Sequence, residues 1–214
     1  MTGLRDELLG RSSAPTPYRM LCPPGWRRVS PDRLAGDAMA PMLEAMKSQG
    51  RADLVLETRR MLADFARSVQ QAQTIDVYLA PASDEVAVPA TMLVNRFRLP
   101  DGVAWEAATA RLAKGAEVWE ADFTETPMWT WIVETPVEGG AVDGGAAPVT
   151  NRVHHYLVPV PEQPSSRALH FQFSVLEVPI EHYAEGEEGR TPLRVYGDLM
   201  MSTMRWVDAP GSGS

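Results

Sequence analysis

Residues 169–175 alternate apolar and polar side chains without a break. The apolar positions are Leu169, Phe171, Phe173 and Val175, and the polar positions between them are His170, Gln172 and Ser174. Because successive residues of a strand point to opposite faces of a sheet, this segment is predicted to be a strand with one apolar face. Residues 117–123, 128–134 and 151–160 are also predicted to be strands. This part of the chain therefore predicts a run of antiparallel strands.

The first half of the chain mixes strands with helices. Strands are predicted at 18–22, 74–80 and 90–99, and another begins at Trp26. The clearest helix runs from about residue 54 to residue 73, where one apolar stripe is formed by Leu54, Val55, Met61, Leu62, Phe65 and Val69. Other helices are predicted at 38–48, 105–113 and 192–205. Helices early, antiparallel strands in the middle and a helix at the end predict an α+β layered sandwich.

The length of the chain, 214 residues, favours one domain over two. We expect an N-terminal extension at 1–17, a single α+β domain at 18–207 and a disordered tail at 208–214. Residues 137–150 are rich in Gly and Ala, and they are predicted to be a flexible insert between two strands.

The charge and the apolar pattern limit the classes of partner. The net charge is -8 and the pI is about 5.0, which argues against a nucleic-acid or anionic-membrane partner, since both require clustered Lys and Arg. No window of about 18 apolar residues occurs, so no membrane insertion is expected. Cys22 is the single cysteine, which leaves no intrachain disulfide and predicts a small buried thiol. Charged residues and prolines interrupt residues 1–21, so these residues do not read as a lipoprotein signal, and a cytoplasmic location is expected.

Three short stretches resemble a known group of proteins. They are Leu-Cys-Pro-Pro-Gly-Trp at 21–26, Tyr-Leu-Val-Pro-Val-Pro at 156–161 and Leu-His-Phe-Gln-Phe-Ser at 169–174, and the closing segment ends in Thr-Met-Arg-Trp at 203–206. With the order of elements over about residues 17–207, they resemble the PsbP-like fold family, and within it actinobacterial proteins of the LpqN type, although without their lipoprotein signal.

The resemblance implies a curved antiparallel sheet flanked by helices, an α/β/α sandwich used mainly as a non-catalytic binding or assembly module. The wider group includes a photosystem subunit and a yeast protein that binds the GTPase Ran. It supplies no catalytic residues to carry over to this chain.

Motifs for catalysis, cofactors or metals are absent from the sequence. His154 and His155 are neighbours in a predicted strand and should point to opposite faces, so both cannot easily bind one metal; a ligand set would need His154 with His170 or Glu134. Neither a nucleophile elbow nor a phosphate-binding glycine loop is present. We therefore predict no catalytic, cofactor or metal residues. We also expect no pocket that holds a buried carboxylate or histidine within hydrogen-bond reach of a second catalytic group.

The strand at 128–134 has apolar residues on both faces. Trp129 and Trp131 share one face with Val133, and Met128 lies on the other face with Thr130 and Ile132. Either helices cover both sides of this strand or one side meets a partner. Trp129, Trp131 and Met128 are therefore the candidate partner surface, with one of the two tryptophans partly exposed or buried only by another chain.

Two functions follow from these patterns. The first is a non-catalytic binding or assembly module that acts through a protein partner or as a homo-oligomer. The second is a carrier for a small apolar ligand held between the sheet and a methionine-lined helix; the methionine stripes are Met39, Met42 and Met46, and Met200, Met201 and Met204. An enclosed apolar cavity would favour the carrier, whereas an exposed apolar patch over a dry core would favour the binding module. Converging titratable groups in a cleft would favour an enzyme.

Overall fold

The computed structural model describes residues 18–34, 52–81, 90–137, 150–161, 165–177 and 192–207. Seven strands of these residues form one sheet in the order β2-β3-β4-β8-β7-β6-β5, and every neighbouring pair is antiparallel. The strands are β2 (Arg27–Val29), β3 (Thr74–Leu79), β4 (Ala90–Arg98), β5 (Trp119–Glu120), β6 (Trp129–Pro136), β7 (Thr150–Pro159) and β8 (Arg167–Glu177).

A second, two-stranded sheet joins the two ends of the described chain. β1 (Tyr18–Arg19) pairs antiparallel with β9 (Arg205–Trp206), so Tyr18 lies opposite Trp206. The sequence predicted that the closing helix would continue to residue 205, and this is wrong. Helix α5 (Pro192–Ser202) ends earlier, and the chain then straightens because residues 205 and 206 find a strand partner in β1.

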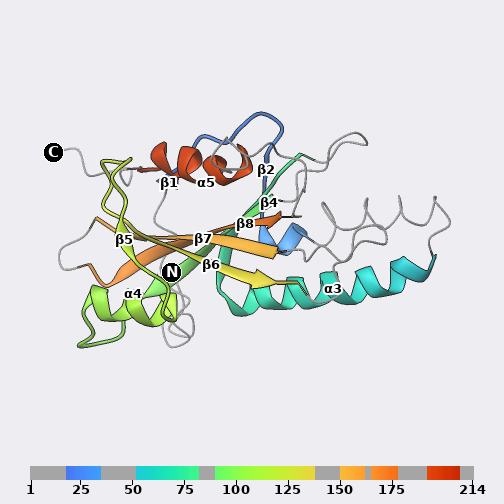
Figure 1. Cartoon of the computed structure of the whole chain (residues 1–214), viewed down its shortest axis with the longest axis horizontal. Coiled ribbons are helices and arrows are strands. Elements are labelled where there is room, and N and C mark those ends of the chain that lie inside the picture. Colours follow the sequence, from blue (N-terminus) through green and yellow to red (C-terminus); the bar gives the residue numbers. More distant parts are fainter. Residues whose placement is uncertain are drawn as a thin grey trace, which may run out of the picture.

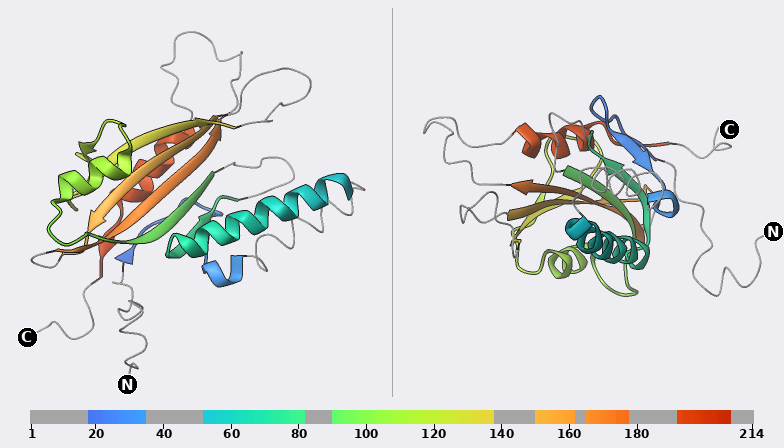
Figure 2. Two further views of the ribbon diagram at one scale, coloured as in Figure 1. Left: turned by 90° about the horizontal axis from the view of Figure 1, so that it is seen from below. Right: turned by 90° about the vertical axis from the view of Figure 1, so that its right-hand side faces the viewer.

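Helices cover both faces of the twisted main sheet (Figures 1 and 2). α5 lies on one face, whereas α3 (Ala52–Gln71) and α4 (Trp105–Ala113) lie on the other, together with the 3-10 turn η1 (Pro31–Arg33). α4 ends at Lys114, which adopts a left-handed conformation, and Gly115 follows with a φ of 94°. The arrangement is an α+β fold with an antiparallel sheet flanked by helices, and it confirms the predicted fold class.

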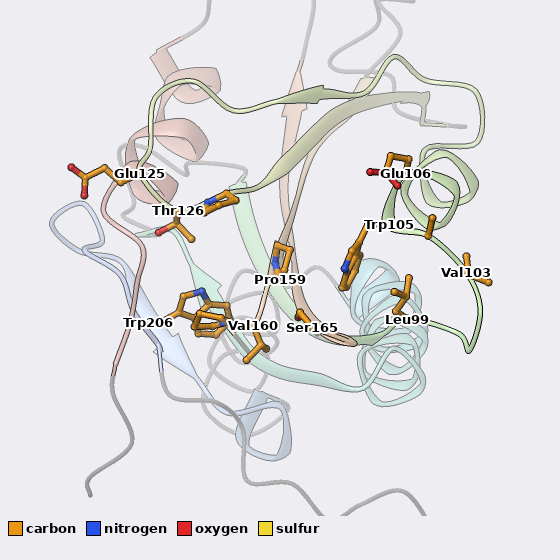
Figure 3. Close-up of a pocket in the computed structure, with 13 residues that line it drawn as sticks. Leu99, Val103, Trp105, Glu106, Glu125, Thr126, Pro159, Val160, Ser165 and Trp206 are labelled. Carbon is orange, nitrogen blue, oxygen red and sulfur yellow. The ribbon is translucent and has the colours of Figure 1, made fainter. Parts of the chain in front are cut away.

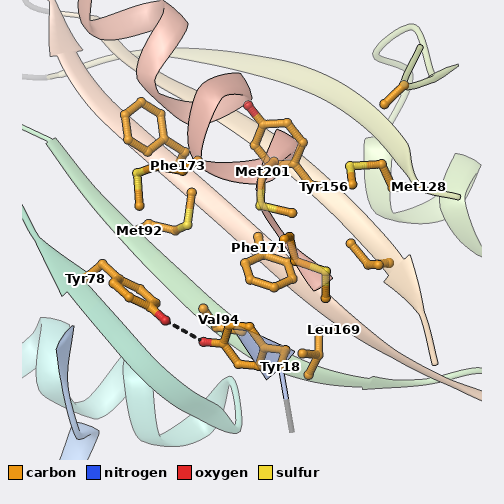
Figure 4. Close-up of a cluster of buried hydrophobic side chains, with 14 of the residues drawn as sticks. Tyr18, Tyr78, Met92, Val94, Met128, Tyr156, Leu169, Phe171, Phe173 and Met201 are labelled. Carbon is orange, nitrogen blue, oxygen red and sulfur yellow. Dashed lines mark hydrogen bonds between the residues drawn. The ribbon is translucent and has the colours of Figure 1, made fainter. Parts of the chain in front are cut away.

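The face under α5 carries the larger core (Figure 4). Apolar residues at alternate positions of β4, β7 and β8 point toward the helix, and Phe171 and Phe173 are fully buried there, as the alternation in 169–175 predicts. The helix contributes Met200 and Met201, and Met204 follows it in the chain; each of the three is no more than 1% exposed. We call this cluster the α5 core.

Gly197 sets how closely α5 approaches the sheet. A β-carbon at this position would lie 2.7 Å from the Tyr156 hydroxyl oxygen and 2.9 Å from the Phe173 ring. Only a residue without a side chain fits at that distance. The space beneath this part of α5 is therefore filled by packed side chains.

The opposite face carries two smaller clusters. Under α3 and η1, Leu34, Val69 and Val77 are buried, and Phe65 packs against them, in agreement with the stripe predicted for the long helix. Under α4, Trp131 and Leu157 are fully buried. Because helices cover both faces, the apolar residues on both sides of β6 are accounted for within the chain.

Some predictions fall on residues that the structure does not describe. These are the extension at 1–17, the helix at 38–48 with Met39, Met42 and Met46, most of the insert at 137–150, and the tail at 208–214. None of the described helices is long and apolar enough to cross a membrane.

Candidate functional site

An open groove of about 800 Å³ lies at one end of the main sheet (Figure 3). Five separate parts of the chain line it: Leu99; Val103, Ala104, Trp105 and Glu106; Glu125, Thr126 and Pro127; Pro159, Val160, Pro161 and Ser165; and Trp206. We call it the tryptophan groove, because Trp105 and Trp206 lie on either side of Pro159. Its wall is mostly apolar and it opens to solvent.

Trp105 is held in place from behind. It is the first residue of α4, and its carbonyl oxygen accepts a hydrogen bond from the Thr109 hydroxyl at 2.7 Å. Its indole stacks on that of Trp129 with ring centroids 5.6 Å apart, and Phe97 lies 6.0 Å away on another side. A ring fixed by two aromatic neighbours loses little conformational entropy when a ligand packs on it.

Trp206 is fixed by the short sheet between β1 and β9. Its neighbour Arg205 donates hydrogen bonds to the carbonyl oxygens of Ser202 at 2.9 Å and Met204 at 2.7 Å, which close the turn after α5. Trp206 itself is half-buried and packs against the edge of the α5 core. Both tryptophans of the groove therefore have one supported side and one side toward the opening.

The charged residues that line the groove are both acidic. Glu106 and Glu125 lie on opposite rims, and neither Lys, Arg nor His is among the lining residues. Both carboxylates are exposed, and no titratable pair converges in the groove. The groove can bind apolar and basic groups, and its described residues offer no general acid and base for chemistry.

A second pocket of about 530 Å³ lies between α5 and the strands β5 to β7. Its walls are formed by Trp119, Asp122, Phe123, Ile132, Arg152, His154, Val195 and Asp198. We call it the small pocket. His154 is only 8% exposed, and its ring lies at the centre of a chain of polar contacts.

These polar contacts link Arg152, His154, Tyr156 and Asp198 in that order. Arg152 Nε donates to His154 Nε2 at 3.2 Å. His154 Nδ1 then faces the Tyr156 hydroxyl at 3.3 Å, and this hydroxyl donates to Asp198 Oδ1 at 2.7 Å. Burial, and then the nearby Asp198 carboxylate, hold the pKa of Tyr156 well above its usual value of 10.

The prediction that no pocket would hold a buried histidine within reach of a second catalytic group is wrong for the small pocket. Arg152, His154 and Tyr156 share one face of β7, so their closeness follows from the strand, whereas Asp198 comes from α5, 42 positions after Tyr156. Both ring nitrogens of His154 are nevertheless engaged by Arg152 and Tyr156.

His155 and His170 lie on the other face of the sheet. His155 stacks on Trp131 with centroids 4.9 Å apart, and its Nδ1 lies 3.1 Å from His170 Nε2. His154 and His155 thus point to opposite faces, as predicted, and His170 pairs with His155 instead of His154. Burial, and next the neighbouring histidine, lowers the pKa of His155 to about 4 and that of His170 to about 3. Among the residues described, no three His, Cys, Asp or Glu side chains are placed to hold a metal.

The structure separates the three residues of the candidate partner surface. Trp131 is 0% exposed and Met128 is 1% exposed, because α4 covers the first and the α5 core surrounds the second. Neither can be part of a surface in this fold, which corrects that part of the expectation. Trp129 is half-buried and supports Trp105 from behind, so of the three residues it is the one that adjoins the tryptophan groove.

Comparisons with known proteins give structural similarities only. Neither a family model nor a curated protein matches the chain. A crystal structure from Bacteroides thetaiotaomicron VPI-5482 is similar over 89% of this chain, with 8% identity and a TM-score of 0.44, and this chain spans 45% of its length. A point mutant of the protein Mog1 and the Saccharomyces cerevisiae Ran-binding protein Mog1p match over 62% of this chain and 79% of theirs. Their identities are 17% and 16%, and their TM-scores are 0.38 and 0.35.

These values are too low to assign a function to the chain. The resemblance to LpqN-type proteins therefore stays a prediction, and the function has to be argued from the two pockets.

Proposed function

We propose that this protein is a non-catalytic binding module that takes an extended segment of a partner protein into the tryptophan groove. The observation that carries the proposal is the pair of indoles, Trp105 and Trp206, fixed on either side of an open groove. Tryptophans that fill or line such sites often supply a large share of binding energy at protein interfaces. Aromatic grooves also take extended segments in known modes of peptide recognition.

Charge narrows the class of segment. Glu106 and Glu125 on the rims favour a Lys or Arg in the partner, and the apolar floor around Pro159 and Val160 favours apolar side chains next to it. The proposed partner segment is therefore extended, apolar and basic. This choice agrees with the negative charge of the whole chain, -8.

A small apolar ligand is the second candidate. The groove lies within the range of about 300 to 1,000 Å³ that small-molecule sites occupy. It does not lie at the second methionine stripe, because Met200, Met201 and Met204 are buried in the α5 core, and the first stripe lies outside the described residues. An open groove leaves one side of a small apolar molecule in water, and this favours the protein segment.

Selection from a display library of short random peptides tests the proposal. We expect enriched peptides to combine apolar residues with a Lys or Arg, and their binding to fall by about tenfold or more with Trp206→Ala or Trp105→Ala. Glu106→Gln with Glu125→Gln should remove the preference for basic residues. Trp119→Ala, in the small pocket, is the matched control and should leave selection unchanged.

Other occupants of the tryptophan groove would give different results in binding experiments. Stoichiometric binding of the uncharged dye Nile red, blocked by Trp206→Ala, without any enriched peptide would replace the proposal by the carrier. Self-association in sedimentation that is lost with Trp206→Ala would replace it by a second copy of this chain. Peptides that bind the two groove variants as well as the original protein would contradict the groove as the site.

A further inference from the structure

The small pocket combines aromatic walls with two carboxylates, and the proposed function does not use it. Trp119 and Phe123 line it on one side, and Asp122 lies between them in the sequence. Trp119 is 42% exposed, which is unusual for an indole that could have packed inside. The pocket shares no lining residue with the tryptophan groove.

Two carboxylates and one guanidinium are among the described residues that line the pocket. They belong to Asp122, Asp198 and Arg152. Arg152 is itself ion-paired with Glu134 and donates to His154, so its positive charge is already directed to groups of the protein. His154 faces Arg152 through Nε2 and Tyr156 through Nδ1, so both of its ring nitrogens are directed to groups of the protein.

We propose that the small pocket binds an organic ammonium ion, with Trp119 and Phe123 as the aromatic contacts and Asp122 and Asp198 as the carboxylates. Aromatic faces attract alkylammonium groups through their quadrupole, and this is the established way in which proteins recognise choline and methylated lysine. Carboxylates beside the rings add a charge term that a neutral molecule of the same shape does not gain.

The hydrogen-bond chain explains why the pocket is preorganised. Asp198 accepts from Tyr156, and Tyr156 is buried against His154, so the carboxylate on the surface of α5 is held from the sheet side. A fixed carboxylate costs less to order when a ligand arrives than a mobile one. His154, Tyr156 and Arg152 are therefore positioning residues, and they need not contact the ligand.

Titration with choline, followed by NMR, tests the proposal. The observable is the indole N–H signal of Trp119, assigned with Trp119→Phe among the six tryptophans of the chain. We expect this signal to shift and saturate with choline. The neutral isostere 3,3-dimethylbutan-1-ol should bind about tenfold more weakly, since it has the same shape and lacks the charge. Sodium chloride at equal ionic strength should produce no saturable shift.

Variants separate this site from the groove. Asp122 is exposed, so Asp122→Asn should keep the fold while it weakens choline binding several-fold. Asp198→Asn should also weaken choline binding. Glu106→Gln, a carboxylate on the groove, is the matched control and should have no effect. A shift with a peptide that carries trimethyllysine, tighter than with choline, would identify a protein side chain as the source of the ammonium group; the reverse order would identify a free amine.

Equal affinity for choline and its neutral isostere would overturn the proposal, as would a choline affinity that Asp122→Asn leaves unchanged. Neither outcome would bear on the peptide groove, because the two pockets have separate residues and separate probes.

Discussion

The α5 core and the tryptophan groove are built from similar residues and differ in whether the chain closes over them. In the core, Phe171, Phe173 and the methionines of α5 are at most 1% exposed, and Gly197 brings the helix as close as packing allows. In the groove, two indoles have support on one side only. Apolar side chains stabilise the fold in the first region, whereas those of the second region are available to a partner.

The two regions differ in what covers their apolar side chains. In the core, α5 is the wall, and burial of large side chains there contributes to the free energy of unfolding. In the groove, the wall would be the bound segment, so removal of a groove side chain should cost binding more than stability.

The largest loss of free energy of unfolding is expected for a substitution in the α5 core. Phe171→Ala should lower the free energy of unfolding by about 3 to 5 kcal/mol, because it leaves a cavity among side chains that cannot move in to fill it. Urea denaturation of this variant measures the loss. Trp129→Ala should cost less, because Trp129 is half-buried. Equal losses for the two variants would mean that Trp129 is as much a part of the core as Phe171.

Acid should act on the face opposite to the α5 core. The folded state holds His155 and His170 neutral, with pKa values of about 4 and 3 against an ordinary value of 6.5. The unfolded chain therefore binds more protons between these values, and stability should fall as pH drops from about 6.5 toward 4. Thermal unfolding across this range measures it. The double variant His155→Gln, His170→Gln should show a shallower fall than the original protein, and an identical slope would contradict the assignment.

Gly197→Ala tests how tightly the core is closed. Helix propensity alone would make alanine more stable than glycine by about 1 kcal/mol. The contacts at 2.7 and 2.9 Å predict the opposite sign, a loss of about 1 kcal/mol or more, because the Tyr156 and Phe173 rings are themselves buried. A rise in the melting temperature would show that the helix can move away from the sheet.

Sequence patterns predicted the parts of this fold that depend on local periodicity. The alternation at 169–175 marks β8, and the faces assigned to Trp129 and Trp131 agree with their common place under α4. A strand or helix period repeats over a few residues, so it can be read without knowledge of the partner.

Features made by distant segments could not be predicted in this way. Residues 205 and 206 become a strand only because Tyr18 and Arg19 lie beside them. The tryptophan groove needs five separate parts of the chain, and the polar chain of the small pocket needs Asp198 from α5. Trp131 was predicted as a surface candidate because its strand is apolar on both faces, and nothing local indicates that α4 covers it.

In the proposed function, the tryptophan groove binds a partner segment and the α5 core does not. The most direct measurement is the NMR spectrum of the indole N–H groups during titration with a peptide selected on the original protein. We predict that the signals of Trp105 and Trp206 shift together and saturate, while that of the buried Trp131 stays in place. Saturable binding without a shift of either groove signal would contradict the claim.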